Sequence, residues 1–209
     1  APPENSSLHE GPWKKIDPNE TVLIGDSLIH GGYGRSFYRG TGLFRSYVKK
    51  FFKGGRSIFT MRRRLERYCV PAKAYIVGAA ANDIASKRRS VAKIEREFLR
   101  IIEIAKRKNP NAKIVLLTLH GDDFRGYTRR PGVIQKMHQL NRRLKFIADR
   151  DPNISLIDIR GEILNAESNG KKVLYRDRLH YNGRGSRGVA RLLKDYLARG
   201  KHGRLTDYI

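Results

Sequence analysis

Three short polar segments of the sequence carry side chains that could together perform nucleophilic chemistry. The first of them is Gly25-Asp26-Ser27-Leu28, which directly follows a short apolar run. A serine in a tight turn after a strand is exposed, and amide groups of the following helix can lie near its hydroxyl. The same position is also typical of an ordinary helix N-cap. Ser27 is therefore a candidate nucleophile, and its context alone leaves both interpretations open.

The other two segments supply a possible base and a possible oxyanion donor. Asp177 stands three residues before His180, a spacing that lets a carboxylate hold the imidazole in the tautomer that accepts a proton from serine. Asn82 follows another apolar run and can donate its side-chain amide to a developing oxyanion. Each pattern is common by itself, since Asn-Asp is also typical of a turn. Their order along one chain makes a hydrolytic site a specific hypothesis.

These candidates follow apolar runs that predict the strands of a parallel sheet. The five predicted strands are residues 21–25, 47–52, 74–79, 113–119 and 154–159. Apolar residues with helical spacing lie between them, at 91–105, 133–147 and 189–197. Strands that alternate with helices of this length indicate a three-layer α/β/α sandwich with a five-stranded parallel sheet. Ligands bind such a sheet at the carboxyl ends of its strands, where the candidate residues lie.

Taken together, the segments resemble the SGNH, or GDSL, hydrolase family over roughly residues 20–199. The resemblance implies a flavodoxin-like strand order and a set of catalytic positions, which here are Ser27, Gly55, Asn82, Asp177 and His180. Two residues depart from the family pattern, because Ala80 and Ile58 stand where glycines are usual. Neither departure removes a catalytic group, but both could reshape the oxyanion hole.

The charge of the chain is a feature that a hydrolase of small neutral esters does not need. Forty-four Lys and Arg against twenty Asp and Glu give a formal net charge of +24. Residues 33–67 hold eleven of these cations, one acid and many aromatic rings, a composition that favours single-stranded RNA. The alternative for the rings is that they belong to the core. The cations expected at the RNA are Arg35, Arg39, Arg45, Lys49, Lys50, Lys53, Arg56 and Arg178.

A hydrolase-like chain this basic is also similar to the OSK domains of insect germ-plasm organisers. That resemblance implies an RNA-binding domain and not an enzyme, with the pocket closed over the inherited catalytic residues. It implies binding of messenger 3′ untranslated regions in cytoplasmic ribonucleoprotein granules, beside other germ-granule proteins, and it selects Arg39 and Arg45 as contacts. The main alternative is an active serine esterase or acetyl hydrolase that uses Ser27, Asp177 and His180. A third possibility is an interaction domain whose charge serves an acidic protein.

The rest of the sequence limits the organisation of the chain. A flexible lead-in is expected at residues 1–18, with Trp13 anchoring it to one domain at 19–209. No apolar run approaches the ~18 residues that cross a bilayer, and no signal-peptide pattern opens the chain. The single cysteine, Cys69, excludes an internal disulfide and is typical of a reducing compartment. We expect a monomeric domain without metal, cofactor or membrane contact, cut from a longer protein.

Overall fold

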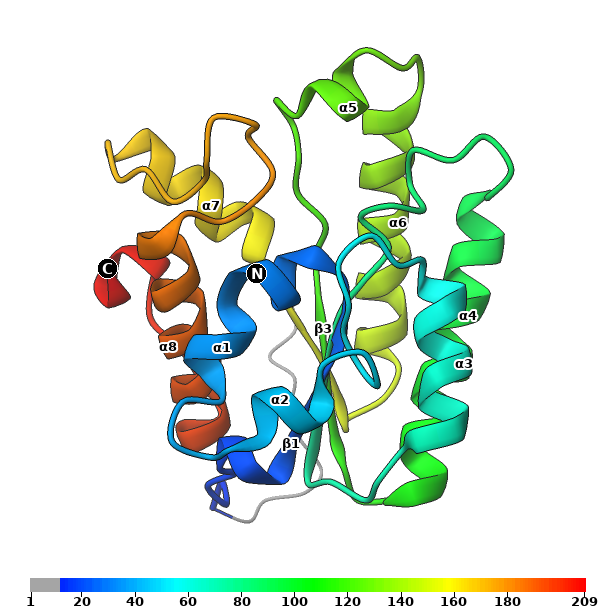
Figure 1. Ribbon diagram of the computed structural model, residues 1–209, viewed down its shortest axis with the longest axis vertical. Helices are drawn as coiled ribbons and strands as arrows, with labels where there is room; N and C mark the ends of the chain where they lie inside the picture. Colours follow the sequence, from blue (N-terminus) through cyan, green and yellow to red (C-terminus); the bar gives the residue numbers. More distant parts are fainter. Residues whose placement is uncertain (1–11) are drawn as a thin grey trace.

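The computed structural model describes residues 12–209, in which a parallel sheet lies between two layers of helices (Figure 1). Four strands follow one another in chain order across the sheet, and they are β1 Thr21–Gly25, β2 Ala74–Gly78, β3 Lys113–Leu117 and β4 Ile154–Ile157. Every neighbouring pair is parallel, so all four carboxyl ends reach the same edge of the sheet. The predicted three-layer α/β fold is confirmed, with four strands in place of five.

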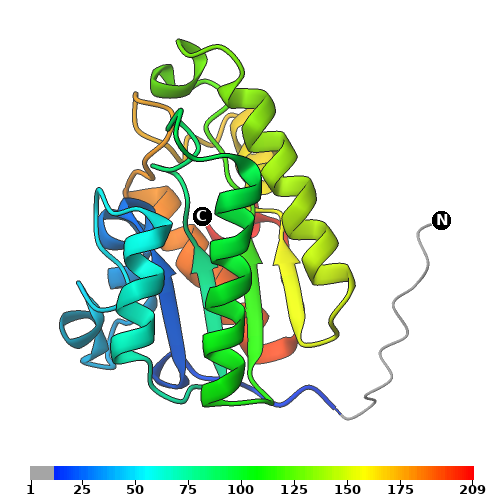
Figure 2. The same ribbon diagram turned by 90° about the vertical axis from the view of Figure 1, so that its right-hand side faces the viewer.

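The long helices cover the two faces of the sheet (Figure 2). One face is covered by α3 Ile58–Tyr68, α4 Val91–Lys108 and α6 Val133–Asp149, and the other by the long α8 Gly183–Arg199 together with the four-residue α1 Gly34–Phe37. The remaining helices are η1 Pro18–Glu20, η2 Ile29–Tyr33, α2 Leu43–Tyr47, α5 Arg125–Thr128, α7 Ile159–Ser168 and η3 Leu205–Tyr208. Element η2 is a single turn of π-helix that begins two residues after Ser27.

The apolar stripes of the three helices predicted from periodicity are buried against the sheet. In α4 and α6 every residue of the predicted stripe is buried, whereas Tyr196 of α8 remains partly exposed. Helix α3 was not predicted, because its buried residues Ile58, Met61 and Leu65 stand among four arginines. Its first turn is capped by the Ser57 side chain, which accepts the Thr60 N–H at 3.1 Å.

The second predicted strand is not formed. Tyr47 ends α2, and Lys49 has a φ of +71°, a left-handed conformation that turns the chain instead of extending it. The segment still reaches the edge of the sheet beside β1, where the Gly25 N–H donates to the Phe51 carbonyl at 3.0 Å and Phe52 forms an isolated parallel bridge. This is the edge position that a flavodoxin-like order gives to the second strand.

Residues 12–18 pack on the body of the domain. The Trp13 indole N–H donates to the Leu197 carbonyl at 2.8 Å, and the indole ring lies 5.8 Å from the ring of Tyr196. Ile16 is buried as well. The remaining part of the predicted lead-in, residues 1–11, lies outside the described residues. Within residues 12–209, no helix combines the length and apolar character required to cross a bilayer.

Candidate active site

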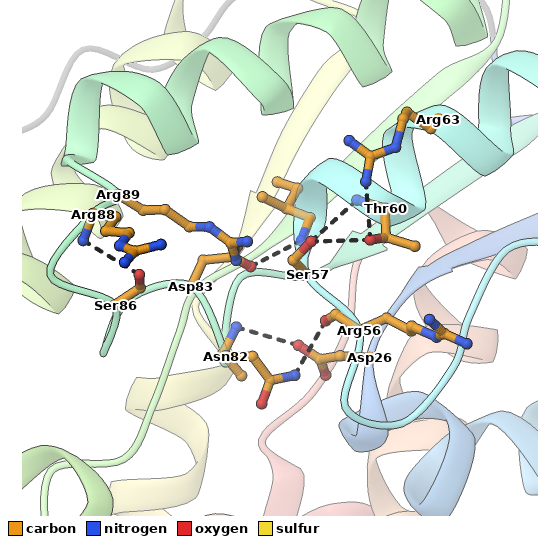
Figure 3. A network of polar contacts seen from close by, with 12 residues as sticks. Asp26, Arg56, Ser57, Thr60, Arg63, Asn82, Asp83, Ser86, Arg88 and Arg89 are labelled. Carbon is orange, nitrogen blue, oxygen red and sulfur yellow. Dashed lines mark hydrogen bonds and ion pairs between the residues drawn. The ribbon is translucent and has the colours of Figure 1, made fainter.

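Ser27 lies in the turn that leaves β1. Gly25 ends this strand where a side chain has no space, since a Cβ would lie 2.1 Å from a backbone oxygen of β2. The next residue, Asp26, is buried, and its carboxylate accepts the Leu28 N–H at 3.1 Å and the Ala81 N–H at 3.2 Å. The second bond fastens the turn to the loop after β2 (Figure 3). These bonds hold Ser27 at the carboxyl edge of the sheet, where the residue is partly exposed.

Ser27, His180 and Asp177 form a continuous hydrogen-bonded relay. The Ser27 Oγ lies 3.0 Å from His180 Nε2, and His180 Nδ1 lies 2.5 Å from Asp177 Oδ2. The other carboxylate oxygen of Asp177 accepts the backbone N–H groups of Leu179 and His180, both at 3.0 Å. Because Nδ1 faces a carboxylate, it carries the imidazole proton, and Nε2 is left to accept the serine hydroxyl.

The electrostatics of Asp177 suit this relay. Partial burial acts to raise the pKa of Asp177, but the Leu179 amide and the His180 ring together outweigh it and hold the pKa below its ordinary value. The carboxylate is therefore ionised at neutral pH and can stabilise an imidazolium. The side chains of Asp177 and His180 are each 40% exposed, so the relay is open to solvent. The predicted closure of the pocket over these residues is not observed.

Gly54 lies next to Ser27, and the oxyanion role expected of its neighbour Gly55 stays a prediction. A Cβ added to Gly54 would lie 3.7 Å from the Ser27 Cβ, whereas a Cβ on Gly55 would meet no heavy atom of the described residues within 4 Å. The Gly54 N–H donates to His30 Nδ1 at 3.1 Å, so a second histidine adjoins the site. Nothing in the sequence singled out His30.

The loop after β2 is fastened to the loop that precedes α3. The Asn82 side-chain amide donates to the Arg56 carbonyl at 3.1 Å, while the buried Asp83 accepts the Ile58 N–H at 2.8 Å and pairs with Arg89 (Figure 3). An amide NH₂ group has two hydrogens, so the bond to Arg56 leaves one N–H of Asn82 for another acceptor. Asn82 therefore belongs to the edge that carries Ser27, as predicted from its place after a strand.

The two departures from the family pattern have different structural consequences. Ala80 has a φ of +80°, in the left-handed region that favours glycine, so the alanine occupies a strained conformation that a glycine would adopt freely. Ile58 is the first residue of α3 and is buried in the core. Neither side chain removes a polar group from the site.

Arg178 does not leave an unpaired cation beside the relay. It has a φ of +67°, and its guanidinium lies 3.4 Å from a Glu167 carboxylate oxygen and 4.0 Å from one of Asp123. The prediction that Arg178 would attract an anion is therefore weakened by two acids that already share its charge.

The other predicted cations are spread over the segment from α1 to α3. Arg35 lies on α1 with its guanidinium 4.4 Å from the centre of the Phe44 ring, and Arg45 lies on α2. Lys49 and Lys50 occupy the turn after α2, and Arg39 follows α1. Lys53 and Arg56 flank the glycine pair next to Ser27. All of these residues except the partly exposed Lys53 are exposed.

Most of the aromatic rings in this segment belong to the core. Five rings are at most 2% exposed, and they are Tyr33, Phe37, Tyr38, Phe51 and Phe52. Such rings cannot stack on bases, because they are already packed against one another and the sheet. No group of three or more His, Cys, Asp and Glu side chains able to hold a metal occurs within residues 12–209.

A helix-covered parallel sheet with a Ser-His-Asp relay at its carboxyl edge has the site geometry of a serine hydrolase. A model of the GDSL-like Lipase/Acylhydrolase family matches residues 23–187, and the chain belongs to this family. The comparison with curated proteins gave no match.

Solved structures of lipolytic and esterase proteins share the fold. A member of the lipolytic protein G-D-S-L family from Veillonella parvula is 19% identical, with a TM-score of 0.62 over 85% of this chain and 94% of that one. A GDSL-like lipase from Bacteroides thetaiotaomicron is 15% identical, with a TM-score of 0.64 over 86% and 88%. A carbohydrate esterase family 3 protein from Talaromyces cellulolyticus is 12% identical, with a TM-score of 0.56 over 85% and 95%.

The prediction of an RNA-binding domain in germ-plasm assembly and messenger localisation is wrong. The family that matches most of the chain is one of lipases and acylhydrolases, and the similar structures carry lipolytic and esterase names. The physical reason lies in the basic segment, where the alternation of rings and cations reflects buried rings below exposed charges. Net charge indicated attraction to anions, but it did not specify a nucleic acid.

Proposed function

We propose that the protein is a serine esterase, an acylhydrolase that cleaves carboxylic esters through Ser27, His180 and Asp177. The observation that carries the proposal is the relay itself, with its distances of 3.0 Å from Ser27 Oγ to His180 Nε2 and 2.5 Å from His180 Nδ1 to Asp177 Oδ2. Family membership supports the same function, because the family model matches residues 23–187, a range that includes Ser27, Asp177 and His180.

The geometry supports a two-step reaction. His180 Nε2 takes the hydroxyl proton as Ser27 Oγ attacks the ester carbonyl, and the tetrahedral intermediate expels the alcohol, which receives that proton. The acyl group then forms an ester with Ser27. Water attacks this acyl-enzyme after giving a proton to His180, and Ser27 leaves as its alcohol while the carboxylic acid departs. Asp177 holds the ring and stabilises the imidazolium in both steps.

We expect two donors for the oxyanion that develops beside Ser27. One is the second N–H of Asn82, whose first N–H is occupied by the Arg56 carbonyl. The other is a backbone amide of the Gly54-Gly55 pair, in which the Gly54 N–H donates to His30 Nδ1 at 3.1 Å. Preorganised donors of this kind stabilise charge that appears in the transition state.

An assay with an aryl acetate tests the proposal directly. Replacement of the nucleophile, Ser27→Ala, is expected to lower kcat/KM by about 10⁴-fold or more, as the loss of a triad member does. Ser46→Ala is the matched control, because this exposed serine lies on α2 outside the relay. A fluorophosphonate probe should label the wild type at Ser27 and leave the Ser27→Ala variant unlabelled. Equal turnover by both serine variants, without labelling of Ser27, would refute the esterase proposal.

We further propose that the similarity to OSK domains reflects common descent of the fold, and it is supported by the shared basic character alone. The monomeric state, the protein partners and the cytoplasmic location stay predictions, which sedimentation and localisation experiments can test.

A further inference from the structure

A hollow of about 540 Å³ lies between η2, α1, α2 and the turn that follows α2. Its walls combine aromatic and aliphatic side chains with three basic ones, and the lining residues are His30, Arg35, Tyr38, Gly42, Phe44, Arg45 and Val48. None of these residues is a member of the relay. The hollow is therefore a distinct feature that the hydrolytic mechanism leaves without a role.

The cations of the hollow are free to receive an anion. Within residues 12–209, no carboxylate lies within 4.0 Å of the guanidinium of Arg35 or Arg45, in contrast to Arg178 and its two acids. Arg35 is stacked on the Phe44 ring at 4.4 Å, which orients the guanidinium at the wall before any ligand arrives. A planar guanidinium held this way suits a carboxylate or phosphate group.

His30 joins the hollow to the nucleophile. Its ring forms part of the wall and lies 6.4 Å from the Phe44 ring, while its Nδ1 accepts the Gly54 N–H at 3.1 Å. Gly54 in turn lies against Ser27. Burial lowers the pKa of His30, and the charges of Lys53 and Arg35 lower it further. The imidazole in this wall is therefore neutral at pH 7, and the positive charge of the hollow resides on the arginines. An extended substrate bound at Ser27 would pass Gly54 and His30 to reach the hollow.

We propose that this hollow binds the anionic end of the substrate, and that the natural substrates are carboxylic esters whose acyl or alcohol chain ends in a carboxylate or phosphate. The partly exposed Phe44 and Val48 contact the apolar part of that chain, and Arg35 and Arg45 pair with the terminal anion. The inference rests on the proposed esterase function and specifies its substrate class. The proposal also explains part of the positive charge of the chain, because basic side chains around the hollow attract an anionic ester.

Matched esters provide the test. Mono-4-nitrophenyl esters of α,ω-dicarboxylic acids with four to ten carbons place a carboxylate at increasing distance from the reacting carbonyl. Each is compared with the same compound carrying a methyl ester at its free end, and an ω-phosphate ester of the best length distinguishes carboxylate from phosphate recognition. We expect kcat/KM for at least one chain length to exceed that of its neutral counterpart about tenfold at low ionic strength.

The variant is the double substitution Arg35→Gln with Arg45→Gln. Its matched control removes two exposed arginines of α4, Arg96→Gln with Arg107→Gln, on the opposite face of the sheet. The net charge change is the same in both proteins. We expect the anionic-to-neutral ratio to fall to about two or less in the hollow variant and to stay near its wild-type value in the control. A ratio near one in the wild type, or an equal fall in both variants, overturns the proposal.

Binding to Ser27→Ala separates this inference from the esterase proposal. The dissociation constant of suberate, measured by calorimetry, should rise about tenfold when Arg35→Gln and Arg45→Gln are added, whether or not any ester is hydrolysed. If neutral esters are cleaved with dependence on Ser27 but the anionic preference is missing, the esterase stands and the hollow is wrong. Binding of tripolyphosphate without any binding of suberate would also overturn the inference, because it would show a site for a chain of charges.

Discussion

The catalytic edge and the basic segment of residues 33–67 both drew attention in the sequence, but they differ in how their side chains are held. At the edge, Asp177 is fixed by two backbone N–H groups and Asp26 by two more, so each carboxylate has one orientation. In the basic segment, Arg62 pairs with two acids, whereas within residues 12–209 the other ten cations have no carboxylate within 4.0 Å.

This difference separates two kinds of functional signal. A reaction needs polar groups at defined distances, and a folded chain provides them through buried hydrogen bonds to its own backbone. Attraction to an anion needs only charge, which exposed arginines and lysines provide without a fixed geometry. The side chains at the catalytic edge therefore indicate a specific chemical step. The basic segment by itself indicates only that a ligand is anionic, and the hollow adds a shape that the ligand must fit.

The largest effect on kcat/KM is expected when the residue that orients the base is replaced. Asp177→Asn should lower kcat/KM by about 10³- to 10⁴-fold, because an asparagine N–H facing Nδ1 moves the imidazole proton to Nε2 and leaves Ser27 without an acceptor. Steady-state hydrolysis of an aryl acetate measures the effect. Asp123→Asn is the control, since it removes an exposed acid from the same surface without touching the relay. Comparable losses in both variants would mean that local charge, and not orientation, matters.

A smaller loss is expected on the oxyanion side. Asn82→Ala should lower kcat by about 10²- to 10³-fold with little change in KM, because its amide contributes in the transition state. The bond to the Arg56 carbonyl is lost as well, which should cost about 1 kcal/mol of unfolding free energy. Kinetics and urea denaturation of the same protein separate the two effects. A loss confined to stability would assign Asn82 to the loop alone.

The pH dependence of stability should come from the catalytic edge and not from the exposed cations. Burial lowers the pKa of His120 to about 4, and burial raises the pKa of Asp26 to about 6. As the pH falls from 6.5 to 4, the unfolded chain protonates its histidine first, so His120 destabilises the fold. Over the same window the folded protein binds a proton at Asp26 before the unfolded chain does, so Asp26 stabilises it.

These two contributions oppose each other, each by up to about 3 kcal/mol, and single substitutions should reveal them. Relative to the wild type, His120→Gln should gain unfolding free energy between pH 7 and pH 4, whereas Asp26→Asn should lose it. Urea denaturation at several pH values is the measurement. Three parallel stability curves would show that neither buried group titrates as its surroundings indicate.

The smallest effect is expected in the basic segment. Lys49 has a φ of +71° and an exposed side chain, so Lys49→Gly should relieve backbone strain and raise the unfolding free energy by about 0.5–1 kcal/mol. Lys50→Gly, one residue further along the same turn, is the control, and it should not stabilise the protein because Lys50 has no positive φ. Chemical denaturation distinguishes them. A stabilised Lys50→Gly variant would mean that the turn gains from general flexibility.

Local patterns were sufficient for the fold, because buried strands and amphipathic helices have periodicities that a sequence displays directly. Ser27 and Asn82 had to meet at one edge because they follow parallel strands. Asp177 and His180 lie between α7 and α8, and they were selected by the resemblance to a hydrolase family. The turn at Lys49 was not predictable in this way, since a β-branched and aromatic run conceals a left-handed residue. Helix α3 was obscured by its arginines.

The sequence by itself determined the layered fold, the excess of positive charge and the identities of Ser27, Asp177 and His180. Only the tertiary structure decided that these three side chains are within hydrogen-bond distance and open to solvent, that Arg178 is paired with acids, and that the rings of the basic segment are buried. The physical reason is the separation along the chain of the residues that decide each feature. Strand and helix patterns follow from neighbours along the chain, whereas the distance between residues 27 and 180 and the pairing of each cation depend on how distant segments pack.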